Sequence, residues 1–589
     1  MMPNTPLPAP KPAGSRLSKL KRPIIGVAAL AALFGGLIGA NVAFGDSASS
    51  FVPAPIAAPP GAYPAMPKPD TKGMTPQQIT VVQRGEYLAT AGDCLPCHTA
   101  PGAKPFSGGL SIVTPFGTLY SPNITPDKTT GIGKWTDTQF WDAVHYGVAP
   151  GSSLAVFPKF LYPAMPYTSY AKLSKPDVMA IKAYLDAIPA VDAPHVPNKM
   201  LFPFNIRASL LGWRIMFFNS GPVHYKKDWS PAVRNGAYLA EALGHCSECH
   251  SPRNLLFAVK SGHTLAGGQI LGESWFAPNI SSSKEYGIGG WSREELVSYL
   301  HNSGNMKRGS AFGPMKAVVD NSLSQLPKSD IEDLAAYLQT ATPPRSTPFK
   351  ATPGASAMVA EGGALYAKNC AACHQANGEG VANVFPNLKG NQAAWGGPAD
   401  DTISAILGGL PPWHPNGPAM PAFGSILNDH QIAAIANYVR TAWGNPGVAD
   451  ATAAQVLALR GTAPPHDVAV ADADFYDPPP IATAAARKLG CPLLTDSMIG
   501  PGSGWMRIMQ DATPATLPNR TRMFVAALRK ANPNLTADQM SHYLLTAYCP
   551  VVAEQTDMSL SAKKAALDRF MQNAWPILAE APAGAKQGG

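Results

Sequence analysis

Three segments of the chain end in the same pattern of apolar and polar positions. Apolar residues recur at i, i+3, i+6 and i+7, a spacing that places them on one face of a helix. They are Val178, Ile181, Tyr184 and Leu185, then Ile331, Leu334, Tyr337 and Leu338, and then Ile432, Ile435, Tyr438 and Val439. The pattern predicts three amphipathic helices that each pack on a core, and therefore a mainly α-helical fold.

Helical signals also occur near the C-terminus. Thr536 and Gln539 form a capping box ahead of an apolar run. A second amphipathic stretch runs near 561–574. We therefore expect a helical C-terminal extension over 482–589, preceded by an Ala- and Pro-rich linker over 446–481.

The N-terminal part pairs a basic lead with an uncharged apolar run. Residues 1–22 carry Lys and Arg but no acid, and residues 23–44 carry no charge. As a helix, that run is roughly 33 Å long, enough to span a bilayer. Residues 1–45 are predicted to be either an export signal or a retained membrane anchor, and both place the following chain outside the cytoplasm. A Pro-rich linker over 46–77 follows.

An apolar connector over 193–227 separates the first two similar segments. Within it, residues 200–218 hold 13 apolar residues of 19, interrupted by Arg207 and Arg214. One interpretation is a helix lying on a membrane surface, with the arginine side chains snorkelling to water. The other is packing between two domains, and the sequence leaves both open.

Composition excludes several classes of protein. At roughly 150 residues per domain, the 589 residues suffice for about four domains. The net charge of +8 is too dilute for a nucleic-acid-binding protein, which would show a clustered basic face. A hydrophobic content of 46% argues against wholesale disorder.

One five-residue motif, Cys-x-x-Cys-His, occurs in each of the three similar segments. It is the attachment sequence of c-type haem. Two cysteines one helical turn apart can form thioethers with the haem vinyl groups, and the following histidine reaches the iron. We predict three covalently bound c-type haems held by Cys94, Cys97, Cys246, Cys249, Cys370 and Cys373, with His98, His250 and His374 as iron ligands.

Cysteine motifs of this kind have two alternative interpretations besides haem. A structural zinc site needs two Cys-x-x-Cys pairs and no histidine after each pair. A disulfide framework is the other alternative, because export permits disulfides. Three copies at equivalent places favour haem.

A six-coordinate electron carrier needs a second axial ligand, and methionine raises the potential. Met165, Met315 and Met420 stand 67, 65 and 46 residues after their histidines, just before each closing helix. Adjacent Gly or Pro residues suit an irregular loop that presses a thioether onto the haem. Met306 competes with Met315 in the second segment.

Two other features of the third segment bear on iron ligation. A carbonyl of the loop 385–388 can accept the N–H of His374 and fix its tautomer, although an ordinary turn proline is an equally good account. His414 is interpreted as an exposed loop histidine rather than a ligand.

The first two segments share a further motif that the third lacks. Asn-Ile is followed, eight residues after the Asn, by Gly-Ile-Gly-x-Trp, at 123–135 and at 279–291. We place the three domains at 78–192, 228–343 and 356–445.

In these motifs the chain resembles the tri-haem cytochrome c subunits of membrane-bound periplasmic dehydrogenases, such as quinoprotein alcohol dehydrogenase and the gluconate, fructose and aldehyde dehydrogenases. The resemblance covers about 78–445 and implies three tandem cytochrome-c-type haem domains, and it does not extend to the helical C-terminal extension. It implies an electron-transfer subunit that is not an enzyme on its own. Its partners would be a catalytic subunit of quinoprotein, molybdenum or flavin type and membrane ubiquinone, with no nucleic acid. Its place would be the periplasmic face of the bacterial inner membrane.

Two other functions were kept as alternatives. A multi-haem peroxidase-type enzyme requires an open axial site, whereas each segment offers a methionine. A cytochrome subunit of a terminal oxidase is the other alternative.

Two cysteines lie outside the haem motifs. Cys491 and Cys549 flank much of the C-terminal extension. In an oxidising compartment we predict that they form a disulfide.

Overall fold

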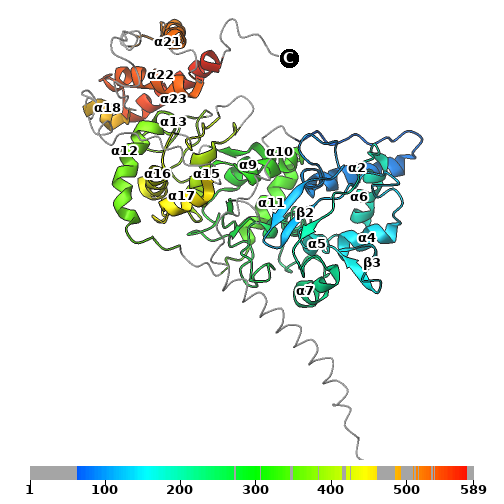
Figure 1. The fold of residues 1–589 in the computed structure, drawn as a ribbon. Coiled ribbons are helices and arrows are strands. Elements are labelled where there is room, and N and C mark those ends of the chain that lie inside the picture. The colour runs from blue at the N-terminus through cyan, green and yellow to red at the C-terminus, as the bar shows by residue number, and fades with distance from the viewer. Residues whose placement is uncertain are drawn as a thin grey trace, which may run out of the picture. The chain divides into compact units, whose positions relative to one another are not determined.

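The computed structural model describes most of the chain from residue 63 to residue 579 (Figure 1). The described residues are 63–270, 274–305, 307–344, 349–382, 384–413, 419–424, 426–460, 484–491, 509, 512–514, 516–531, 535 and 537–579. The predicted export segment, Met306, His414 and Thr536 lie outside them. No helix within these ranges is long and apolar enough to cross a bilayer.

Three pairs of packed helices organise the chain up to residue 445. The predicted closing helices are confirmed as α6 (Lys175–Ala187), α11 (Lys328–Thr340) and α16 (Asp429–Thr441). Each packs on the helix that precedes a Cys-x-x-Cys-His motif, namely α2 (Pro76–Ala91), α8 (Pro231–Tyr238) and α12 (Met358–Asn369). Their predicted apolar faces are buried, apart from the half-buried Tyr438. We call residues 78–192, 228–343 and 356–445 the first, second and third repeats.

A glycine lies where the two helices of each pair cross. A Cβ on Gly85, Gly236 or Gly362 would overlap a backbone carbonyl of the partner helix, at Ala180, Asp333 or Ala434. In the third repeat Gly362, not the neighbouring Gly363, occupies the crossing. Close backbone approach therefore requires glycine at all three crossings.

A methyl group at one of these crossings should destabilise the protein measurably. We expect Gly236→Ala to lower the free energy of unfolding by about 3 kcal/mol, since the two backbones would have to separate. Gly212→Ala is the control, because Gly212 lies in a helix with no heavy atom within 4 Å of its would-be Cβ. Thermal unfolding of the two full-length variants checks this, and equal melting temperatures would contradict it.

The first repeat adds short helices and strands between α2 and α6. The chain runs through α3 (Cys94–Cys97), β1 (Ser111–Thr114), β2 (Gly117–Tyr120), α4 (Asp137–His145), β3 (Val148–Ser153), β4 (Phe157–Phe160) and α5 (Tyr167–Tyr170). The connector supplies β5 (Lys199–Met200), the 3-10 helix η1 (Arg207–Ser209) and α7 (Leu210–Phe217). Strands β1, β2 and β5 form one antiparallel sheet, and β3 pairs with β4 in a hairpin.

The second repeat places its irregular segments between α8 and α11. They are η2 (Leu239–Leu243), η3 (Cys246–Glu248), β6 (Gly268–Gln269), β7 (Phe276–Ala277), α9 (Arg293–Asn302), β8 (Gly304–Asn305), β9 (Gly309–Ser310), α10 (Pro314–Asn321) and η4 (Leu323–Gln325). The antiparallel pairs β6–β7 and β8–β9 are each two residues long. The sequence pattern therefore predicts the main packing helices correctly, and the space between these helices is filled by loops and short elements.

The third repeat continues beyond its predicted end. Its other elements are η5 (Ala355–Ala357), α13 (Ala371–His374), α14 (Gln392–Trp395), α15 (Asp400–Gly408), η6 (Ala442–Gly444) and α17 (Ala453–Arg460). Helix α17 falls within the predicted linker 446–481, yet it packs on α15 and α16 with Val456 fully buried. The Asn437 side chain bonds both backbone groups of Ala451, at 3.0 and 2.9 Å. The linker prediction is therefore wrong for residues 446–460, whose apolar face belongs to the core of the third repeat.

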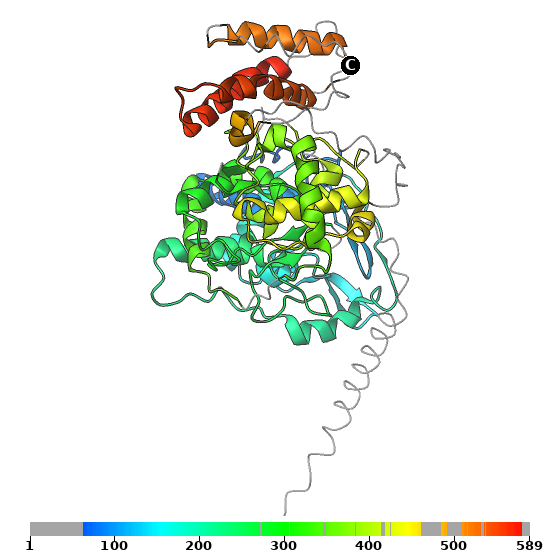
Figure 2. The ribbon, with the colours of Figure 1, turned by 90° about the vertical axis from the view of Figure 1, so that its left-hand side faces the viewer.

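The C-terminal extension is helical, as predicted. It contains α18 (Ala484–Leu489), α21 (Leu517–Ala531), α22 (Ala537–Ala553) and α23 (Leu560–Ala579), coloured orange to red in Figure 2. The Cys491–Cys549 disulfide is confirmed. We call the described residues of 484–579 the C-terminal module. It shares one hydrophobic cluster with Val381, Val384 and Phe385 of the third repeat.

The two arginines of the connector point toward the protein, whereas the membrane interpretation predicted that they point toward water. Arg207 donates to the carbonyl of Phe160 at 2.7 Å, and the Arg214 guanidinium lies 4.8 Å from the Phe160 ring centroid. Arg214 also stacks near Tyr167 and Phe218. Both cations therefore face the protein rather than snorkelling to water, because aromatic rings from β4 and α5 attract them there.

Candidate haem-binding sites

Each Cys-x-x-Cys-His motif forms a single helical turn directly after the first helix of its pair. The backbone N–H of the histidine donates to the carbonyl of the first cysteine in every copy, at 3.1 Å in the first repeat, 2.9 Å in the second and 2.9 Å in the third. This turn brings both cysteines and the histidine together, as the sequence predicted. None of the six motif cysteines is in a disulfide.

A proline carbonyl holds each motif histidine. The Nδ1 atoms of His98, His250 and His374 lie 2.9, 2.7 and 2.8 Å from the carbonyl oxygens of Pro122, Pro278 and Pro386. A carbonyl can only accept, so Nδ1 carries the proton and Nε2 keeps its lone pair for a metal. The bond expected in the third repeat is therefore present in all three.

Sequence reasoning missed the first two of these carbonyls. They stand 24 and 28 residues after their histidines, against 12 in the third repeat. A signal was nevertheless available, because each proline is followed by asparagine, at 122–123, 278–279 and 386–387.

The shared Gly-Ile-Gly motif has a structural explanation in these loops. The N–H of Ile132 donates to the carbonyl of Thr125, and that of Ile288 to the carbonyl of Ser281, both at 2.9 Å. The motif thereby closes the loop that begins at the Pro-Asn pair. It positions the proline carbonyl in the first two repeats, and the third repeat reaches the same bond with a shorter loop.

Burial sets the protonation of these groups. It lowers the pKa of His98, His250 and His374, so each imidazole is in the neutral form that binds iron. Burial raises the pKa of Cys94 to about 12 and that of Cys246 to about 11, so both groups are neutral thiols in the free chain. Within the described ranges, no cluster of three or more His, Cys, Asp or Glu residues is arranged to hold a metal ion.

The three candidate methionines pack on two hydrophobic clusters, one common to the first two repeats and one in the third. Met165 and Met315 pack on the cluster that also contacts Cys94 and Cys246, and Met420 packs on the one that contacts Cys370. Met165 and Met420 lie outside helices, as expected for a ligand loop.

Met315 departs from the expected irregular loop. It is the second residue of α10, because Pro314 begins that helix after Gly313 in a left-handed conformation. The competing Met306 lies outside the described residues.

The motifs of the first two repeats lie close to each other. The thiol of Cys249 is near enough to Cys97 to contribute to the raised pKa of Cys97, after burial, Asp93 and Cys94. Thr168, three residues after Met165, donates to the Glu248 carboxylate within the second motif at 2.8 Å. The two motifs therefore share one interface.

Two equivalent tyrosine–aspartate bonds join the same two repeats. Tyr87 of α2 donates to Asp330 of α11 at 2.8 Å, and Tyr238 of α8 donates to Asp177 of α6 at 2.6 Å. Each tyrosine follows its crossing glycine by two residues, and each aspartate is the third residue of its helix. Each repeat therefore contributes the tyrosine of one bond and the aspartate of the other.

The third repeat contacts the loop that holds the second histidine. Gln392 of α14 donates to the carbonyls of Asn279 and Tyr286, at 3.0 and 2.8 Å. Asp401 of α15 accepts from the N–H of Phe276 at 2.7 Å. The second repeat therefore contacts both of the others.

Comparison with known proteins agrees with this geometry. A family model described as "Cytochrome c" matches residues 359–443, within the third repeat. The chain is 35% identical over 410 residues to the cytochrome c subunit of alcohol dehydrogenase (quinone) of Gluconacetobacter polyoxogenes, covering 65% of this chain and 85% of that one. It is 36% identical over 401 residues to the gluconate 2-dehydrogenase cytochrome c subunit of Pantoea cypripedii, covering 64% and 89%. It is 38% identical over 406 residues to the fructose dehydrogenase cytochrome subunit of Gluconobacter japonicus, covering 62% and 79%.

The motif turns, their histidine–carbonyl bonds and the family match define a c-type cytochrome, a class that carries covalently bound haem and transfers electrons. The chain belongs to the family of cytochrome c subunits of alcohol, gluconate and fructose dehydrogenases.

Proposed function

We propose that this chain is a tri-haem electron-transfer subunit. It takes electrons from a catalytic dehydrogenase subunit and passes them through three c-type haems to ubiquinone at the periplasmic face of the inner membrane. The observation that carries the proposal is the same histidine–proline carbonyl bond at all three motifs. Family membership supports the dehydrogenase partner.

The residues of each repeat fit the group they are proposed to hold. When bound, each haem supplies an iron that gains and loses one electron. The two motif thiols would anchor it by thioethers, the histidine Nε2 would bind one side of the iron, and Met165, Met315 or Met420 the other. The proline carbonyl keeps the imidazole in the required tautomer and orientation.

The contacts between repeats support transfer from haem to haem. The second motif adjoins the first, and the second histidine loop adjoins the third repeat. The chain itself is proposed to have no catalytic residue for substrate oxidation. The partner, of quinoprotein, molybdenum or flavin type, would hold the alcohol, aldehyde or sugar substrate.

An outer apolar patch supports the membrane part of the proposal. It consists of exposed side chains from the connector and from the β3–β4 hairpin: Leu154, Val156, Phe157, Leu201, Phe202, Leu211, Ile215 and Met216. Because Arg207 and Arg214 point inward, α7 leaves its apolar side chains outside, with none of its residues buried.

The charges around this patch favour an anionic lipid surface. The windows 143–176 and 193–227, which contain the hairpin and the connector, have no Asp or Glu. Lys159 and Lys199 are exposed in them. Lysines near such a surface contribute roughly 1 kcal/mol each to binding anionic lipid.

Acidic substitutions in the patch should release the protein from lipid. We expect Val156→Glu combined with Ile215→Glu to weaken binding to phosphatidylglycerol-containing vesicles by more than about tenfold, since burying one such side chain contributes roughly 1.5–3 kcal/mol. Leu457→Glu, half exposed on α17, is the control. Vesicle co-sedimentation of chains lacking residues 1–45 measures the effect, and unchanged binding would remove the patch from the proposal.

The function is tested by haem content and electron delivery together. The purified full-length protein should carry three haem masses per chain and co-purify with a dehydrogenase that reduces ubiquinone analogues when given its substrate. Fewer than three haems would overturn the tri-haem proposal. Rapid binding of cyanide or peroxide at one haem would favour the peroxidase-type alternative.

A further inference from the structure

The C-terminal module packs against the third haem motif itself. Helix α22 contacts α13, the turn that carries the motif. The Ser541 hydroxyl oxygen lies 3.9 Å from the Sγ atom of Cys373. Ser541 is 1% exposed, whereas Cys373 is half-buried. Cys373 itself packs on the hydrophobic cluster of the module.

The module also holds the loop that orients His374. The rings of Phe385 and Trp575 meet edge to face with centroids 6.1 Å apart. Gln572 donates to the carbonyl of Ala382 at 2.8 Å. Pro386, next to Phe385, provides the carbonyl that accepts from His374. The module therefore contacts both a haem-attachment cysteine and the support of the proximal histidine.

An ion pair lies at the edge of the contact between the C-terminal module and the third repeat. Lys564 of α23 lies 2.8 Å from the Glu379 carboxylate, which Lys389 also contacts at 3.1 Å. The two lysines hold the pKa of Glu379 below its usual value despite partial burial. Both partners are more than a third exposed, so the pair contributes little to stability and marks the edge of the contact.

The first two repeats place equivalent cysteines near each other. Cys249 adds to the raised pKa of Cys97, after burial, Asp93 and Cys94, although Cys97 remains exposed. At Cys373 of the third repeat, Ser541 of the module lies close to the sulfur, on a helix that packs on the motif turn. The third motif is therefore contacted from outside its own repeat.

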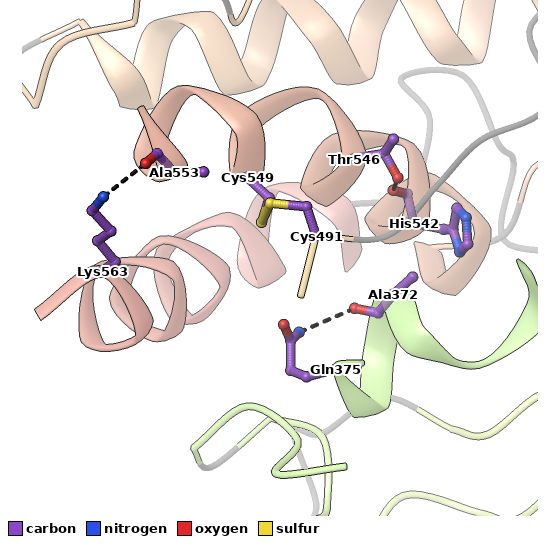
Figure 3. Close-up of a disulfide and its surroundings, with 8 residues drawn as sticks. All are labelled: Ala372, Gln375, Cys491, His542, Thr546, Cys549, Ala553 and Lys563. Atoms are coloured by element: carbon purple, nitrogen blue, oxygen red, sulfur yellow. Dashed lines mark hydrogen bonds between the residues drawn. A yellow bond between two sulfur atoms is a disulfide. The ribbon is translucent and has the colours of Figure 1, made fainter. Parts of the chain in front are cut away.

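The disulfide fixes the helix that makes this contact. Cys549 lies on α22, and Cys491 lies two residues after the end of α18 (Figure 3). Figure 3 also shows α22 above the turn that carries Ala372. The bond therefore ties α22 to a second segment of the module while α22 contacts α13.

We propose that the C-terminal module is a cover for the thioether edge of the third haem. The vinyl groups that form thioethers sit on the periphery of the porphyrin, so a group that covers Cys373 covers that edge. The module keeps water and diffusing one-electron reagents from it. By lowering the local polarity, it disfavours the more highly charged oxidised form and raises the potential of this haem. The inference rests on the proposed binding of a third haem.

Variants on the module side test the cover without altering the third repeat. Lys564→Ala, Gln572→Ala and Trp575→Ala together remove the ion pair, the hydrogen bond and the ring contact. Ser541→Trp is a separate variant that forces α22 away from Cys373. The matched control is Asn519→Ala, Arg522→Ala and Met523→Ala, three changes on the exposed face of α21.

Two measurements on the full-length haem protein are needed. The first is the potential of the third haem by spectroelectrochemical titration, assigned as the component missing in a Cys370→Ala/Cys373→Ala variant. The second is the rate at which hexaammineruthenium(II) gives one electron to that haem, taking it from Fe(III) to Fe(II). We expect both module-side variants to lower the potential of the third haem. We also expect them to raise its rate of reduction by about tenfold, which is the lower end of the effects that groups around a metal site produce.

The control should leave both values unchanged. Unchanged potential and rate in both module-side variants, with three haems still attached, would overturn the cover and leave the tri-haem function standing. Fewer than three haems in the unsubstituted protein would overturn both.

Discussion

Replacing His250 with alanine should lower electron transfer from dehydrogenase substrate to ubiquinone by at least about 100-fold, the upper end of what even groups around a metal site contribute. The substitution removes the proposed iron ligand but leaves Cys246 and Cys249, so the haem should stay attached. The effect is expected to be large because the second repeat contacts both of the others.

Steady-state assays of the complex with two acceptors measure this effect. Reduction of a ubiquinone analogue should fall, whereas reduction of a dye that accepts electrons directly from the catalytic subunit should stay the same. His263→Ala is the control, because this histidine is in the same repeat and its Nδ1 atom lies 3.0 Å from the carbonyl oxygen of the nearby Ser261. An unchanged quinone rate in His250→Ala would show that the second haem is not on the path.

Removing the Cys491–Cys549 disulfide should destabilise the C-terminal module by about 4 kcal/mol, the loop-closure value for cysteines 58 residues apart. That is a large part of the 5–15 kcal/mol that typically stabilises a domain. The melting temperature of the module should therefore fall by about 15 °C.

Calorimetry of full-length Cys491→Ala/Cys549→Ala against the unsubstituted protein tests this value. Met523→Ala, exposed on α21, serves as the control for a change in the same module. Because α22 contacts α13, the variant should also bring the potential of the third haem toward that of Ser541→Trp. A melting temperature within 2–3 °C of the control would contradict the predicted contribution, at roughly 4 °C or more per kcal/mol.

The sequence predicted the parts of the fold that depend on local spacing. The closing helices followed from four apolar positions on one face, and the motif turns followed from the five residues of each motif. The bond of His374 was also expected, because its proline is only 12 residues away.

The features that were missed or wrong depend on contacts between distant segments. The spacing of Arg214 within the connector does not show that Phe160 and Tyr167 attract it inward. The same holds for residues 446–460, whose composition resembles a linker although Val456 completes a core. Met315 is an exception, because the helix that contains it begins at Pro314, which is a local signal.

The doubled tyrosine–aspartate bond between the first two repeats makes their contact isologous, the arrangement found in symmetric homodimers. In such a contact, one surface recognises a copy of itself, so a single-motif protein with this surface would already have brought two motifs together by dimerising. The fused chain keeps that symmetry while allowing the halves to diverge. Ser174 beside Tyr238 donates its N–H to the tyrosine oxygen, whereas the equivalent position beside Tyr87 is Pro327, which has no N–H to donate.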